Sequence, residues 1–192
     1  CCKDISELRV ILDDLCCEYS FNRNDMTTFW TKYGHSDRFD DANTVYVKRL
    51  LQYVLPEELR SYVSGTLFEK YVGVSRSEFA KELYMSINEI SELVKQGMYV
   101  GSHGSHHYWL DKLTKRRQIT DIESSLGFLE SVGAPTKNWI MCYPYGQYNT
   151  DTLDILKTLG AKVGLTTESR IVDLKKDNNL TLPRLDTNDF PQ

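Results

Sequence analysis

Apolar residues in the first half of the chain recur at the three- and four-residue spacing of amphipathic helices. One such face consists of Leu8, Ile11, Leu12, Leu15 and Tyr19. A second face lies within residues 45–54, and a third follows Pro56, a residue that can open a helix at its first turn. Residues 20–41 are rich in Asn, Asp, Thr and Gly, which favours a polar connection with only short helical turns. We therefore expect residues 1–85 to be a mostly helical segment.

The pattern changes at Ser86, where helix and strand signals begin to alternate. Ser86 and Glu89 have the spacing of a capping box, and Gly97 is placed to end the helix that they begin. Residues 98–100 are apolar and predict a short buried strand directly after that helix.

The same alternation continues to the end of the chain. Residues 114–132 have helical periodicity, and residues 139–143 and 161–166 predict strands on either side of a helix that begins at Asn149 or Thr150. Strands that alternate with helices are typical of a parallel sheet or barrel, so the predicted class is α/β.

Three of the four histidines lie within residues 100–110, where a short apolar run breaks on glycine. His103 and His107 are four positions apart, and Gly101 and Gly104 let the backbone turn both imidazoles toward one point. By spacing alone such a pair is more often a surface or core feature than a metal site. Ligands of α/β folds gather at the carboxyl ends of strands, however, and these histidines follow a predicted strand.

Composition excludes several classes of function. The 23 basic and 27 acidic residues give a net charge of −4 without long blocks of one sign, so nucleic acid is not an expected partner. Apolar stretches stay well below the roughly 18 residues that span a bilayer, so no membrane span is expected.

Five cysteines without zinc-ribbon spacing favour reduced thiols and a cytoplasmic setting. The chain starts at Cys1 rather than methionine, so we expect that a preceding segment was removed.

Two motifs together carry a family resemblance. Residues 101–107 read Gly-Ser-His-Gly-Ser-His-His and are followed by Leu110, and residues 143–146 read Tyr-Pro-Tyr-Gly. In these motifs the chain resembles the polysaccharide deacetylases, the chitin-deacetylase-like carbohydrate esterases with a NodB-homology domain. The resemblance covers roughly residues 86–187. It implies a distorted (β/α) barrel of which residues 86–192 are the C-terminal part, with residues 1–85 as a helical insertion.

The resemblance implies a divalent metal, most of all Zn²⁺, with His103 and His107 as ligands. His106 then stands beside the site without binding the metal. Two neutral imidazoles and one carboxylate leave positions open on such an ion for the water that attacks the acetyl carbon.

The second motif implies roles in substrate binding and in stabilising the oxyanion. The backbone amide of Tyr145 would bind the oxyanion, and Tyr143, Pro144 and Gly146 would line the sugar groove. The arginine usual near this motif is missing, and Arg184 is the expected substitute, holding a catalytic carboxylate by a bidentate contact. A surface ion pair between Arg184 and Asp186 is an equally good interpretation.

The first motif of the family, an Asp-Asp pair after a buried strand, is not found. Phe39, Asp40 and Asp41 follow a polar stretch and precede Ala42 instead of glycine, so we interpret them as a false match. Residues 36–71 resemble an insertion of some bacterial members. The base and the third ligand are therefore expected before Cys1, and this chain alone is expected to be inactive.

Three functions follow as hypotheses. The first is a metal-dependent hydrolase that removes N-acetyl groups from an amino sugar or polysaccharide. No histidine follows His107 to act as the general acid, which leaves an O-acetyl esterase acting on a glycan as an alternative. The missing Asp-Asp pair also allows a non-catalytic carbohydrate-binding relative. The residues do not identify the glycan, the physiological metal, the general acid, or whether two chains pair.

Overall fold

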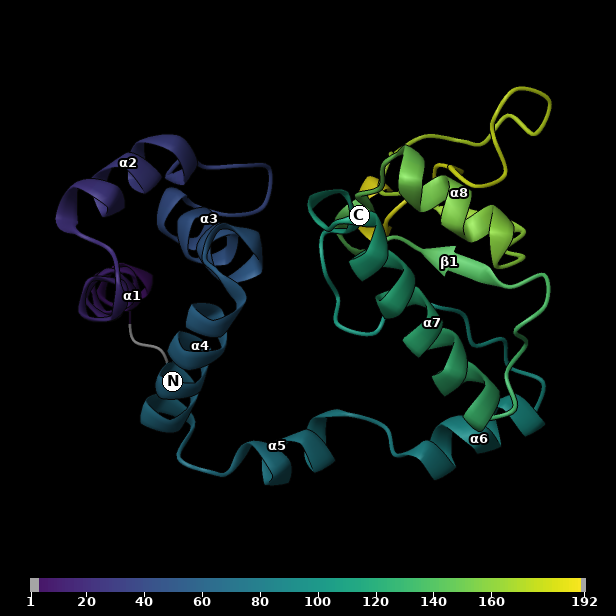
Figure 1. Ribbon diagram of the computed structural model, residues 1–192, viewed down its shortest axis with the longest axis horizontal. Coiled ribbons are helices and arrows are strands. Elements are labelled where there is room, and N and C mark those ends of the chain that lie inside the picture. The colour runs from purple at the N-terminus through teal and green to yellow at the C-terminus, as the bar shows by residue number, and fades with distance from the viewer. Residues whose placement is uncertain (1–3, 191–192) are drawn as a thin grey trace. The chain divides into compact units, whose positions relative to one another are not determined.

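The computed structural model describes residues 4–190, and the chain divides into two compact units. The first is Cys1–Tyr84 and the second is Met85–Gln192 (Figure 1). The paired cysteines at positions 1 and 2 lie outside the described residues, whereas Cys16, Cys17 and Cys142 are free thiols. Among residues 4–190, no helix has the length and apolar character needed to cross a membrane.

The first unit contains only helices among its described residues. They are α1 (Ile5–Tyr19), α2 (Arg23–Tyr33), α3 (Ala42–Arg49), the π-helical turn η1 (Leu50–Val54), α4 (Glu57–Val72) and α5 (Arg76–Leu83). The prediction of a largely irregular connection over residues 20–41 is wrong for α2. Asn22 accepts from the amides of Asn24 and Asp25, and the Asp25 carboxylate accepts from the Asn22 amide. This capping box satisfies helix-end donors that hydrophobic periodicity does not reveal.

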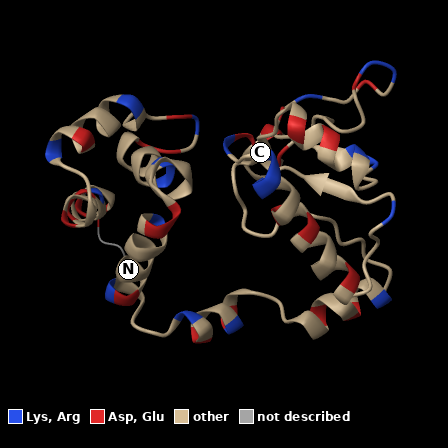
Figure 2. Ribbon diagram, in the orientation of Figure 1, with Lys and Arg blue, Asp and Glu red and all other residues tan. Residues whose placement is uncertain are grey.

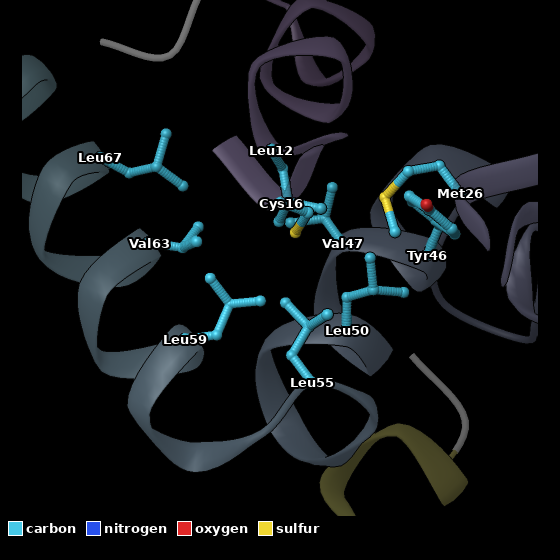
Figure 3. Close-up of a cluster of buried hydrophobic side chains, with 10 residues drawn as sticks. All are labelled: Leu12, Cys16, Met26, Tyr46, Val47, Leu50, Leu55, Leu59, Val63 and Leu67. Atoms are coloured by element: carbon cyan, nitrogen blue, oxygen red, sulfur yellow. The ribbon is translucent and has the colours of Figure 1, made fainter. Parts of the chain in front are cut away.

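The core of the first unit lies where α1, α3 and α4 meet. Figure 3 shows its fully or nearly fully buried side chains, which are Leu12, Cys16, Met26, Tyr46, Val47, Leu50, Leu55, Leu59, Val63 and Leu67. Within it the Tyr46 hydroxyl donates to the Asp13 carboxylate at 2.7 Å. Burial raises the pKa of Asp13, and the hydrogen bond from Tyr46 opposes that rise.

The Phe39-Asp40-Asp41 tripeptide forms a helix-capping turn. Asp41 accepts from the amides of Asn43 and Thr44 at 2.8 and 3.1 Å and so caps α3. Asp40 pairs with Lys48 at 2.5 Å, and 67% of Phe39 is exposed. These contacts give Asp40 and Asp41 roles in the local structure, and the interpretation of the tripeptide as a false match to an Asp-Asp metal motif stays a prediction.

The second unit combines helices with a small parallel sheet. Its elements are α6 (Ile87–Lys95), η2 (Leu110–Lys112), α7 (Lys115–Ser131), β1 (Ile140–Cys142), η3 (Pro144–Gly146), α8 (Thr150–Thr158), β2 (Val163–Leu165) and η4 (Thr187–Asp189). Strands β1 and β2 are parallel, with Met141 opposite Gly164. The described residues form this two-stranded α/β arrangement and no closed barrel.

Side-chain caps and apolar contacts fix the elements of this unit. Ser86 and Glu89 form the predicted capping box of α6, and Asn149 forms one with Thr152 at the start of α8. The prediction of a strand at residues 98–100 is wrong. These residues form no strand, and the β-bridge in this segment joins Ser102 to Met141. The buried cluster of this unit consists of Leu110, Ile122, Trp139, Met141, Tyr143, Ile155, Leu156, Ala161 and Leu180.

We expect Tyr46→Phe to lower the free energy of unfolding by about 1–3 kcal/mol at pH 7, because a buried carboxylate loses its hydrogen-bond donor. The loss should be smaller near pH 4, since the bond favours the charged form of Asp13 and protonation removes that benefit. Urea unfolding at both pH values measures it. Tyr62→Phe is the control, because Tyr62 is exposed, and an equal loss in both variants would contradict the prediction.

Candidate metal centre

The histidine loop, residues 103–107, begins where the chain has passed alongside β1. The Ser102 amide donates to the Ile140 carbonyl, and the Cys142 amide donates to the Ser102 carbonyl, both at 2.9 Å. These bonds hold Ser102 in register with the strand, so His103 follows at its carboxyl end. This is the edge at which ligands of parallel α/β sheets bind.

The imidazoles of His103 and His107 lie together, with ring centroids 4.7 Å apart. The Nδ1 atom of His103 is 2.7 Å from the Cys142 carbonyl oxygen. A carbonyl can only accept a hydrogen bond, so Nδ1 carries the proton and Nε2 keeps its lone pair. Histidine ligands of metal sites are commonly fixed in this way by a backbone carbonyl.

His107 is placed by Tyr145 of η3. Its Nδ1 atom lies 3.1 Å from the Tyr145 hydroxyl, and either group can be the donor. Desolvation, and after it the charge of His103, lowers the pKa of the His107 imidazole. The lowered pKa favours the neutral form of this ring, which is the form that binds metal.

Both His107 and Tyr145 adopt the left-handed backbone conformation, each with φ of 57°. Non-glycine residues held there cost about 1–3 kcal/mol each and cluster at functional sites. The Tyr145 ring lies between His107 and Trp109, at centroid distances of 4.6 and 5.0 Å. The structure therefore brings the two sequence motifs into contact at the predicted edge.

The remaining residues of the second motif have structural roles in this arrangement. Tyr143 is fully buried and donates to the Leu180 carbonyl at 2.5 Å, and burial raises the pKa of its hydroxyl. This corrects the expectation that its side chain lines a sugar groove. Pro144 is also buried. Gly146 has φ of 72°, and a Cβ there would lie 2.1 Å from the Thr167 hydroxyl oxygen.

Arg184 lies beyond the end of β2, held by backbone contacts. Its Nε donates to the Thr166 carbonyl at 2.9 Å, and its amide donates to the Glu168 carbonyl at 3.0 Å. Asp186 instead caps η4 by accepting from the Asn188 amide. Within the described residues Arg184 and Asp186 form no ion pair, so that interpretation is wrong.

A surface cavity of about 540 Å³ borders one side of the histidine loop. Residues 100–105 line it from the loop, and α7 contributes Ser124, Ser125, Phe128 and Leu129. It includes His103 but neither Tyr143 nor Tyr145. This cavity therefore lies on the α7 side of the histidine loop.

Sequence analysis missed Asp121 of α7, which contacts the same loop. It is 3% exposed, and its carboxylate accepts from the Ser105 amide, the His106 amide and the His106 ring. The sequence contained a signal for this residue. Asp121 directly precedes Ile122 on the buried face of α7, and that face carries no other charged residue. His106 is thus bound to α7 through Asp121, and its place beside a metal site stays a prediction.

The donor set fits part of a zinc site. His103 presents a fixed Nε2 lone pair, and His107 is a second, neutral imidazole. Among residues 4–190, no group of three or more His, Cys, Asp or Glu side chains is arranged to hold a metal ion. The described residues therefore bring together two candidate ligands, His103 and His107.

Comparison with known proteins places these motifs in a family. The polysaccharide deacetylase family model matches residues 38–164. The Bacillus subtilis (strain 168) protein YxkH, whose name assigns it to the polysaccharide deacetylases, is 27% identical over 136 residues. The match covers 70% of this chain and 42% of YxkH, so the chain spans less than half the length of this curated relative.

Two solved structures show a partial likeness to this chain. The Streptococcus pyogenes deacetylase PplD, solved in complex with acetate, is 27% identical, with a TM-score of 0.48 over 53% of this chain and 44% of PplD. IcaB from Ammonifex degensii is also 27% identical, with a TM-score of 0.46 over 54% of this chain and 48% of IcaB.

We expect His103 to populate the Nδ1-protonated tautomer at pH 8, because the Cys142 carbonyl accepts from that nitrogen. Long-range proton–nitrogen NMR correlations of the two ring nitrogens measure the tautomer. His35, which is exposed, is the reference and should show mainly the Nε2-protonated form that is common in solution. The same Nε2-protonated form at His103 would contradict the assignment.

Proposed function

The chain belongs to the polysaccharide deacetylase family, and from this premise we propose that it contributes to an enzyme that removes acetyl groups from a carbohydrate. The substrate class we propose is an N-acetylated amino sugar or polysaccharide. The observation that carries the proposal is the convergence of His103, His107 and Tyr145 at the carboxyl end of β1. A distorted (β/α) barrel, of which the second unit would be a part, is the fold that we propose for the complete domain.

We propose that His103 and His107 hold a divalent metal, with Zn²⁺ as the preferred ion. When bound, such a metal would supply an acidified water, because the ion lowers the pKa of the water far below its value in bulk, to about 7 at the best tuned sites. A carboxylate from outside the described residues would complete the ligand set. The Cys142 carbonyl supports this role, because it keeps the His103 Nε2 lone pair available for the ion.

Tyr145 is the proposed oxyanion-binding residue. Its backbone amide belongs to the η3 turn, and the left-handed conformations of Tyr145 and Gly146 fix the direction of that turn. A preorganised amide donor at a developing oxyanion contributes about 10²–10³ in rate. The Tyr145 side chain has a second role. It contacts His107 and Trp109 and so joins this turn to the histidine loop and the residues after it.

The choice between N-acetyl and O-acetyl substrates depends on how the leaving group receives a proton. An amine leaving group needs a general acid more than an alcohol does. No histidine follows His107 in the sequence, so the donor is unassigned and an O-acetyl esterase remains the second candidate. Arg184 is proposed to orient a catalytic carboxylate, with the Thr166 carbonyl holding its Nε near the end of β2.

We expect the 192-residue chain to bind one Zn²⁺, and either His103→Ala or His107→Ala to weaken binding at least tenfold, because each removes a ligand of the ion. Calorimetric titration with Zn²⁺ at pH 7.5 measures this. His35→Ala is the matched control, since it removes an exposed imidazole of the first unit. Equal affinities in all four proteins would overturn the proposed ligands.

Acetate release from matched N- and O-acetylated oligosaccharides separates the two enzymatic candidates. We expect the Zn²⁺-loaded protein to prefer the N-acetylated substrate. Preferential release from the O-acetylated substrate would favour the esterase. Glycan binding that persists after chelation and in His103→Ala, without acetate release, would favour a non-catalytic carbohydrate-binding protein.

A further inference from the structure

One face of α7 is built against the histidine loop. Asp121, Ser124 and Ser125 follow the helical spacing that places residues on one face. The Ser125 hydroxyl lies 2.7 Å from the Ser102 hydroxyl, and the Ser124 hydroxyl lies 3.2 Å from that of Ser105. These contacts join the helix to both the entry and the middle of the loop.

Asp121 makes the strongest of these contacts. Its Oδ2 accepts from the Ser105 amide at 3.1 Å, and its Oδ1 accepts from the His106 amide at 3.0 Å and from His106 Nδ1 at 2.8 Å. Hydrogen bonds to an ionised acceptor are roughly twice as strong as neutral ones. Because two of the three donors are backbone amides, the carboxylate fixes the path of the chain itself.

Gly104 lets the backbone of the loop come close to the Asp121 carboxylate. Gly104 has φ of 71°, and a Cβ built on it would lie 2.7 Å from Asp121 Oδ2. The backbone can approach the carboxylate this closely only where no side chain intervenes. The glycine at this position therefore matches the buried acid on α7.

The contact with Asp121 restrains the backbone next to a strained residue of the loop, His107. His107 holds a left-handed conformation that persists only where the surrounding structure over-determines it. The two residues immediately before it are those that Asp121 binds. On the other side, the Cys142 carbonyl holds His103. Each histidine thus lies next to a segment that is fixed from outside the loop.

We propose that Asp121 is a positioning residue, whose buried carboxylate clamps the Ser105 and His106 amides and thereby makes the His103 and His107 imidazoles converge. Both carboxylate oxygens are occupied by loop donors, so Asp121 acts through the loop and does not bind the metal itself. The inference rests on the proposed function in so far as the converging rings serve a metal.

The test compares the full 192-residue chain with its Asp121→Asn variant. Asparagine keeps the size of the side chain but turns one acceptor into a donor, which opposes an amide of the loop. In the unmodified protein the 4.7 Å separation of the rings should give a nuclear Overhauser effect between His103 and His107 ring protons. We expect D121N to lose this signal and to bind Zn²⁺ at least about tenfold more weakly.

Two controls separate positioning from general stability. Asp154→Asn makes the same charge change at an exposed residue of α8, and Ile155→Val weakens the core of the same unit. Both should keep the ring signal and the Zn²⁺ affinity. The indole NH signal of Trp139, which donates to the Leu159 carbonyl, reports that the unit is folded. A folded D121N with an unchanged ring signal and affinity overturns the proposal.

If D121N does not fold, Asp121→Glu replaces it, because it keeps the charge but displaces the acceptor oxygens by one methylene. A weakened ring signal then supports the clamp, and an unchanged signal and affinity overturn it. The ring signal is measured without metal or substrate. A wild-type chain that shows the signal but binds no Zn²⁺ would count against the proposed function and not against the clamp.

Discussion

The hydrogen bond between the His103 imidazole and the Cys142 carbonyl is the constraint on which the candidate site depends. It connects a side chain of the loop to the backbone at the end of β1. It also determines which ring nitrogen keeps a lone pair. The position of that carbonyl is fixed in turn by the pairing of β1 with β2 and with Ser102. The small two-stranded sheet, whose strand β1 is labelled in Figure 1, therefore positions the carbonyl that selects the tautomer of His103.

Strain and burial support this arrangement from two sides. Tyr145 and His107 both have left-handed backbones and contact each other through their side chains. Gly146 permits the sharp turn on one side, and the buried Asp121 holds the loop on the other. Functional loops are usually less restrained than the elements that carry them. Here the loop is restrained by hydrogen bonds to a strand end and to a helix.

Helix α7 carries basic residues in its first turn and an acidic residue, Asp121, on its buried face. The first turn of α7 is basic and contains no acidic residue (Figure 2). Cations at a helix N-terminus oppose the helix dipole, so this turn gains nothing from its own charges. The buried acid of the helix, Asp121, is satisfied by donors of the histidine loop. The Asp121 carboxylate therefore acts on the histidine loop through direct hydrogen bonds.

The sequence by itself determined the local features of this protein. The capping box at Ser86, the start of a helix at Asn149 or Thr150, the helix over residues 115–131 and the histidine motif could all be predicted from it, because each depends on residues close together in the chain. The family resemblance likewise rested on short motifs, and the family match confirmed it. A strand at residues 98–100 was predicted in error, since an apolar run does not reveal whether a partner strand lies beside it.

Tertiary structure decided the rest, because the decisive contacts join residues far apart in sequence. The partners of His103 and His107 are 39 and 38 positions away, and no periodicity encodes such a contact. Burial of Tyr143 and the clamp by Asp121 also depend on packing between separate elements. The sequence thus identified the candidate histidines, and only folding determined their orientation, the tautomer of His103 and the groups that hold both rings.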